Sequence, residues 1–112
     1  ILMSLLSSSI KSNNHKLYFS KIELSKILRL YSNGVSKGKW KDYALDFNKN
    51  YAIFYIYKHT LSTPDFVLLK SFEKKQKKFI YNLILNNKKN IKFENLDLLI
   101  LSLKDKNIKL IN

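Results

Sequence analysis

The chain has 112 residues, a formal net charge of +13 and a hydrophobic fraction of 46%. This length fits one domain, and the aromatic and aliphatic content argues against a disordered chain. The chain contains no Cys, which excludes disulfides and Cys-ligated metal sites and fits a reducing, cytoplasmic setting, and no apolar run reaches the ~18 residues of a transmembrane helix.

The first helix is predicted near residues 20–36, after a Ser-rich segment, residues 1–15, that we expect to be a mobile tail. Ser20 and Glu23 have the S-x-x-E spacing of a capping box, and Phe19 precedes them in the staple position. Apolar residues then recur at helical spacing: Leu24, Ile27, Leu28 and Tyr31.

The end of this helix has two candidate positions. Asn33-Gly34 could end it, or the helix could continue with a local distortion to Gly38, and we expect the end between residues 33 and 37. Gly38 tolerates positive φ and lets the chain reverse toward the sheet. Trp40 then lies where helix and sheet meet, a corner that suits a large buried indole. The sequence GKWKDYALDF is therefore interpreted as a structural hinge.

Two segments rich in aromatic and β-branched residues, 42–47 and 51–59, flank a polar turn and predict a β-hairpin. In the second segment, Ala52, Phe54 and Ile56 point to one face. Residues on the opposite face are Tyr51, Ile53, Tyr55 and Tyr57. Because both sets are apolar, alternation alone does not determine which face packs on the core.

Pro64 marks a loop, and residues 65–72 and 79–87 predict a third and a fourth strand. Residues 94–104 predict a closing helix with an apolar stripe, after which residues 105–112 are expected to fray. The element order is therefore α-β-β-β-β-α. Short connections favour an α+β fold in residues 16–104, in which both helices pack on one face of an antiparallel sheet.

Three sequence patterns also resemble a known family: F-x-x-x-E-L-x-x-I-L-x-L-Y, G-x-W-x-D-Y-A-x-D-F and A-x-F-x-I-Y-K. The chain is similar, over residues 17–103, to a small proteobacterial family of uncharacterised proteins, a domain of unknown function about a hundred residues long. The most specific part of the likeness is carried by Gly38, Trp40, Asp42, Tyr43, Ala44 and Asp46. Asn33-Gly34 departs from the helix formers that the family has there. The resemblance implies a shared fold and a cytosolic setting, and it implies no activity.

No residue pattern indicates an enzyme. His15 and His59 stand alone, without the spacing of metal ligands, so no metal site is expected. Asp42 and Asp46 lie four residues apart on an extended segment, about 13 Å at ~3.3 Å per residue, which is too far for a pair of catalytic carboxylates. Two Gly residues are too few for a phosphate-binding loop, and no cofactor is expected.

The basic charge favours an anionic partner such as RNA, DNA or the ribosome. Tyr55 and Tyr57, beside Lys58, could form a platform on which bases stack. A dense basic loop adds four cations: Lys74, Lys75, Lys77 and Lys78. The alternative is that the tyrosines pack across strands and the lysines form a solvated turn.

A second hypothesis assigns the chain to protein interaction. Among 21 basic residues Arg29 is the only arginine, which fits A+T-rich coding bias rather than selection for phosphate contacts. If both helices cover one sheet face, the other face would expose Ile53, Tyr55 and Tyr57 as an apolar patch. A homodimer or another partner protein would bury this patch.

Overall fold

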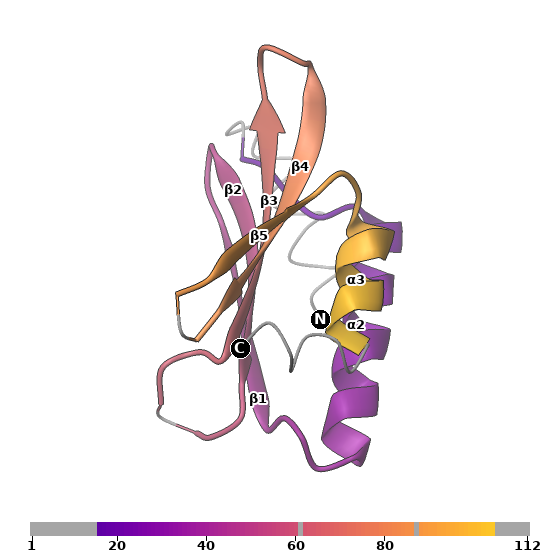
Figure 1. Cartoon of the computed structure of the whole chain (residues 1–112), viewed down its shortest axis with the longest axis vertical. Coiled ribbons are helices and arrows are strands. Elements are labelled where there is room, and N and C mark those ends of the chain that lie inside the picture. The colour runs from indigo at the N-terminus through magenta and orange to yellow at the C-terminus, as the bar shows by residue number, and fades with distance from the viewer. Residues whose placement is uncertain (1–15, 61, 87, 105–112) are drawn as a thin grey trace.

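The structure, a computed structural model, describes residues 16–60, 62–86 and 88–104. It contains α2 (Lys21–Ser36), β1 (Asp42–Phe47), β2 (Tyr51–Tyr57), β3 (Phe66–Glu73), β4 (Lys78–Leu85), β5 (Asn90–Phe93) and α3 (Leu96–Lys104). The strands form one antiparallel sheet, and both helices lie on the same face of it (Figure 1). The predicted α+β class and the position of the helices are confirmed. The two predicted tails fall outside the described residues.

The strands are arranged in chain order, β1-β2-β3-β4-β5, so the sheet is a meander with one strand more than predicted. The additional strand β5 pairs with β4 through Tyr81 opposite Phe93 and Leu83 opposite Ile91. The correct order is therefore α-β-β-β-β-β-α. Sequence analysis missed β5 because its four residues contain only two apolar side chains, too few to establish a period of two.

The core lies between the helices and the face of the sheet that carries Ala52, Phe54 and Ile56, all of which are fully buried. This arrangement decides the question that alternation left open. The opposite face carries Tyr51, which is exposed, and the half-buried Ile53, Tyr55 and Tyr57. The helices bury Leu24, Ile27, Leu30, Leu96, Leu99, Ile100 and Leu103 against the sheet.

Helix α2 continues through Asn33 and Gly34 and ends at Ser36, inside the predicted interval. The Gly38 N–H donates to the Val35 carbonyl at 2.9 Å, and the Lys39 N–H donates to the Gly34 carbonyl at 2.8 Å. These two bonds form a Schellman motif, and Gly38 occupies its left-handed position with φ of 73°. The predicted reversal at Gly38 is confirmed.

Trp40 packs directly on Gly34 of the helix, so no side chain fits at that position. A Cβ atom built on Gly34 would lie 2.6 Å from Cδ2 of the Trp40 ring, closer than any real contact. Trp40 is only 6% exposed and stacks with Tyr31 at 6.3 Å between ring centroids. The predicted hinge is thus held by the contact between Gly34 on the helix and the indole of Trp40 in the segment that follows the helix.

We expect Gly34→Ala to destabilise the protein by about 1–3 kcal/mol, although alanine favours helices, because the new methyl group overpacks the Trp40 ring. The matched control is Ser32→Ala on the exposed side of the same helix, which should change stability by less than about 0.5 kcal/mol. In a Trp40→Ala background the penalty at Gly34 should disappear, because the clashing ring is absent. Urea unfolding measures all three, and an equal Gly34→Ala penalty with and without the indole would contradict the contact.

Candidate functional site

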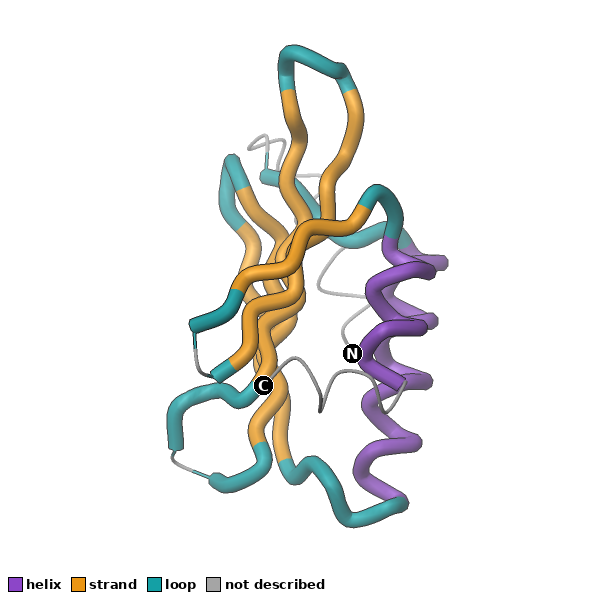
Figure 2. Tube along the Cα trace, in the orientation of Figure 1, coloured by secondary structure: helices purple, strands orange, loops and turns teal. Residues whose placement is uncertain are grey.

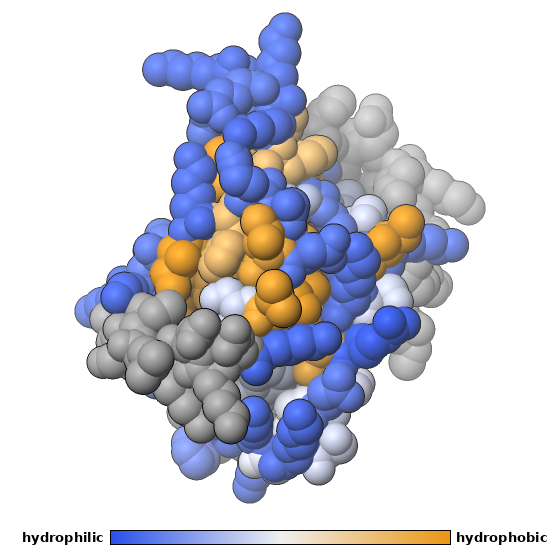
Figure 3. Space-filling view, turned by 45° about the vertical axis from the view of Figure 1, so that its right-hand side comes forward, coloured by the Kyte–Doolittle hydropathy of each residue, from blue (hydrophilic) through white to orange (hydrophobic). Residues whose placement is uncertain are grey.

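The hairpin formed by β3 and β4 projects beyond the rest of the sheet (Figure 2). Glu73 and Lys78 form its last residue pair, and residues 74–77 make the turn. Lys77 adopts positive φ, 52°, a conformation that a turn of this kind requires and that glycine or asparagine would adopt at lower cost. Hydrophilic residues cover the far end of this projection in the space-filling view (Figure 3).

The turn concentrates positive charge, because three lysines follow a single carboxylate, Glu73, at this end of the hairpin. Lys78 is paired, because its ammonium contacts both carboxylate oxygens of Glu94 at 3.0 Å and lowers the pKa of that carboxyl. Within the described residues, Lys74, Lys75 and Lys77 are exposed and have no ion pair. Three adjacent cations are therefore free to attract an anion.

Two exposed aromatic rings lie beside these cations. Phe72 and Phe79 are opposite each other on β3 and β4, and are 46% and 41% exposed. Their ring centroids are 5.2 Å apart in an edge-to-face arrangement. We call Phe72, Phe79, Lys74, Lys75 and Lys77 the basic tip. The sequence did not predict that these rings are exposed, because Phe72 lies on the same face of β3 as Leu68 and Lys70, which is the core face. The hairpin extends past the helices that cover that face (Figure 1).

The tyrosines and Lys58 predicted as part of the same site lie elsewhere. Tyr51 is opposite Ser71, so the start of β2 is the end nearest the basic tip. Lys58 follows the other end of β2, where its ammonium lies 5.9 Å from the centroid of the Phe66 ring. The structure therefore brings Lys74, Lys75, Lys77 and Lys78 together and separates them from Lys58 and Tyr57.

Carboxylates border the tyrosines. On the adjacent edge strand Asp42 is opposite Tyr57, and Asp46 is opposite Ile53. Burial, followed by the charge of Asp46, raises the pKa of Tyr55, which keeps the phenol neutral. Asp42 also accepts a bond from the Tyr43 N–H at 2.8 Å. Negative charge along this edge of the sheet disfavours phosphate there.

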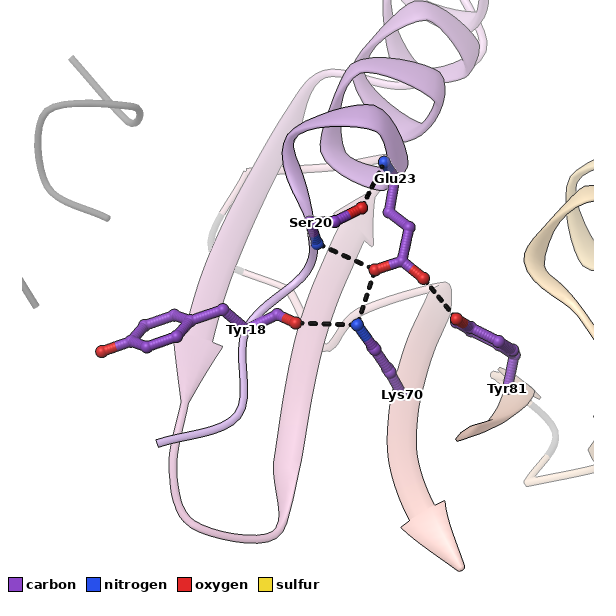
Figure 4. A network of polar contacts seen from close by, with 5 residues as sticks. All are labelled: Tyr18, Ser20, Glu23, Lys70 and Tyr81. Carbon is purple, nitrogen blue, oxygen red and sulfur yellow. Dashed lines mark hydrogen bonds and ion pairs between the residues drawn. The ribbon is translucent and has the colours of Figure 1, made fainter. Parts of the chain in front are cut away.

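The first turn of α2 is joined to the sheet by a polar network (Figure 4). Ser20 and Glu23 form the predicted capping box, and the same Glu23 carboxylate accepts from the Lys70 ammonium at 2.6 Å and from the Tyr81 hydroxyl. Lys70 also donates to the Tyr18 carbonyl at 2.9 Å, and its side chain is only 6% exposed. Sequence analysis found the capping box and missed the other contacts. One sign of these contacts is present in the sequence, because Lys70 occupies a core-facing position of a strand.

The network lowers the pKa of one of its members and raises the pKa of another. Burial tends to raise the pKa of Glu23, but hydrogen bonds from Lys70, Tyr81 and Ser20 outweigh it and lower the pKa. Burial and the bond to Glu23 raise the pKa of Tyr81 well above its ordinary value. The network is therefore a carboxylate held between a cation and a neutral phenol, and it fixes the N-terminus of α2 on the sheet.

A family described as "Protein of unknown function (DUF2794)" matches residues 17–95. The chain belongs to the DUF2794 family. No curated protein and no solved structure matches the chain. The resemblance noted in the sequence is thereby confirmed as membership of an uncharacterised family.

The DUF2794 match extends from the residue before Tyr18 to the residue before α3, so it includes the basic tip and the buried network.

Within the described residues of this DUF2794 protein, no three His, Cys, Asp or Glu side chains lie close enough to hold a metal ion. Of its described helices, neither is long and apolar enough to cross a membrane. A pocket of about 250 Å³ lies at the C-terminal end of α2, and Trp40, Lys37 and Lys104 form part of its lining.

We expect Lys70→Met to destabilise the protein by about 3 kcal/mol, because it leaves the Glu23 carboxylate in a partly buried site without its cation. Adding Glu23→Gln should recover a large part of this loss, since the remaining group is neutral. The control is Lys26→Met, which breaks an exposed pair with Asp97 and should cost less than about 1 kcal/mol. Urea unfolding of the single and double variants measures the coupling, and additive losses would contradict it.

The free energy of unfolding should fall in acid partly through Glu23. Because its pKa is lower in the folded protein, its contribution is complete above the unfolded value near ~4.3 and is lost as the pH falls through the folded pKa. The stability difference between wild type and Glu23→Gln should therefore shrink as the pH is lowered from neutrality to about 3. A difference that stays constant over this range would show that the carboxylate is not stabilised by folding.

Proposed function

We propose that this protein is a non-catalytic module that binds single-stranded RNA or DNA through the basic tip. The observation that carries the proposal is the combination of three unpaired lysines with two exposed phenylalanine rings on one projecting hairpin. The lysines and the rings would contact different parts of a nucleotide. The ammonium groups attract phosphates, and the rings offer apolar surfaces on which bases stack.

The chemistry of the tip favours binding that tolerates different sequences. Lysine is a point charge on a flexible stem, whereas reading of a base edge relies on the planar fork of arginine or on amide side chains. Gln76 is the one amide in the turn. A β-ribbon that carries aromatic rings and lysines therefore fits a flexible single strand better than a duplex with stacked bases.

The tip is preferred over the tyrosine face for this function. The tyrosines lie beside Asp42 and Asp46, and the nearest predicted cation, Lys58, is at the far end of the strand from the tip. A phosphate near Tyr55 would meet carboxylates, whereas a phosphate at the tip meets unpaired ammonium groups. The proposal includes a cytoplasmic location, where RNA and DNA are both accessible.

Replacing Lys74, Lys75 and Lys77 together with Gln should weaken binding of a short fluorescent oligouridylate and flatten its salt dependence. On a single strand each lost phosphate contact lowers the slope of log affinity against log salt by about 0.7, so the total change should be up to about 2. Phe72→Ala should reduce affinity by about 1–3 kcal/mol if a base stacks on that ring. Fluorescence anisotropy between roughly 50 and 200 mM salt measures both effects.

The matched control replaces three lysines at the opposite end of the molecule, Lys37, Lys39 and Lys41, with Gln. It removes the same charge but leaves the tip intact, so it separates local contact from general attraction by a basic protein. Equal slope changes in the two triple variants would contradict a site at the tip. An absence of binding by the wild type at about 50 mM salt would overturn the proposed function.

A further inference from the structure

The face of the sheet opposite the helices, which we call the uncovered face, is apolar in its middle. By alternation and register it carries Ile53, Tyr55, Val67, Leu69 and Ile84. Each of these five side chains is half-buried by its neighbours, and no described helix or strand packs on them. A contiguous apolar area of this kind on a small domain usually marks an interface.

Charges lie at the margins of the uncovered face in a specific order. One row across the five strands consists, from β1 to β5, of Asp46, Ile53, Leu69, Asn82 and Lys92. Asp46 and Lys92 are exposed, and neither has an ion pair within the described residues. They are separated by four strand spacings, about 19 Å, so they cannot pair within one copy.

We propose that a second copy of this chain packs on the uncovered face, around a two-fold axis that runs parallel to the strands and passes near Leu69. This rotation places β1 of each copy over β5 of the other. Asp46 of each copy then faces Lys92 of the other, and the two Leu69 side chains meet in the middle. In the next row Tyr55 faces Ile84 of the other copy, and the two Val67 side chains meet.

The charges also disfavour the other way of stacking two such faces. A two-fold axis perpendicular to the strands would place β1 over β1 and β5 over β5. Asp42 and Asp46 would then approach the same carboxylates of the second copy, and Lys92 would approach Lys92. Like charges across an interface are unfavourable, whereas the first arrangement makes two symmetric ion pairs at the rim of an apolar centre. Face-to-face sheets with nearly aligned strands are a common packing.

The preferred arrangement places both basic tips at the same end of the dimer. The dimer itself does not depend on the proposed nucleic-acid function. The functional value of having both tips at one end does rest on it. Two tips on one side could contact one strand together, which raises the avidity for a longer oligonucleotide without any new contact.

Sedimentation velocity over a concentration series, without nucleic acid, tests the dimer independently of that function. The wild type should dimerise, and Asp46→Lys or Lys92→Asp alone should weaken the dimer at least about tenfold, because each sets like charges against each other at both rims. The double variant Asp46→Lys with Lys92→Asp restores opposite charges and should dimerise as the wild type does. The control Asp97→Lys, on the outer side of the helix layer, should leave the dimer intact.

A wild type that stays monomeric at every concentration would overturn the proposal. A dimer that survives both single variants, or that the double variant fails to restore, would show that this row does not form the interface. Circular dichroism of each variant establishes that the fold is retained.

The direction of the axis has its own test, because the chain has no Cys and a single label is therefore specific. A spin label on Gln76→Cys reports the distance between the two tips. The expected distance is about 10–25 Å, since stacked sheets lie about 10 Å apart. The perpendicular axis would separate the tips by about 40 Å, since each lies about six residues beyond Leu69 at about 3.3 Å per residue, and that result would overturn the proposed arrangement.

Discussion

Both described helices cover the same face of a sheet of five strands, and the other face has no described helix on it. Helix α3 has nine residues, about 13 Å, whereas β3 and β4 have eight residues each, about 27 Å. The β3–β4 hairpin also runs past both helices at the end where α2 begins (Figure 1). The uncovered face and the basic tip both follow from this mismatch, the first because a whole face lacks a helix and the second because the hairpin outruns α3. Each exposes apolar side chains that the alternation pattern alone would assign to a core.

The Glu23–Lys70 contact lies at the N-terminus of α2, where the helix layer begins to cover the sheet. A carboxylate in the first turn of a helix is already favoured by the N-terminal end of the helix dipole. Lys70 adds a cation from the middle strand, and its ammonium is satisfied by Glu23, by the Tyr18 carbonyl and by the Phe79 ring at 4.4 Å. A buried ion pair is costly unless its hydrogen bonds are complete, and here they are shared among three partners. The contact therefore fixes where α2 begins on the sheet more than it strengthens the core.

The sequence predicts those features that depend on neighbouring residues. The capping box locates the start of α2, and Gly38 and Trp40 locate the hinge, because caps and reversals are encoded within a few positions. Features that depend on distant residues were missed. Gly34 could be assigned to the helix only once the Trp40 ring was known to pack on it. Phe72 and Phe79 have the register of core residues, and only the position of the helices along the sheet shows that these rings are exposed. Strand β5 is defined by its pairing with β4 rather than by a pattern of its own.

The scarcity of acidic residues gives each carboxylate unusual weight. The chain has eight acidic residues against 21 basic ones, so an accessible carboxylate is surrounded by potential partners. Glu23, Glu94 and Asp97 bind lysines. Their ion pairs join α2 to β3, the start of β4 to the residue after β5, and α2 to α3. Asp65 accepts from the Lys58 backbone N–H and orders a loop.

Asp46 has no such partner in the described part of its own chain, although it is exposed on a regular strand. The cation that shares its row is beyond reach across the sheet. Glu73 also has no ion pair within the described residues, so the support for a second copy comes from the position of Asp46 in one row with Lys92 rather than from its lack of a partner. Because the uncovered face carries its own unpaired lysine at the opposite margin, the simplest source of that partner is the same face of a second copy.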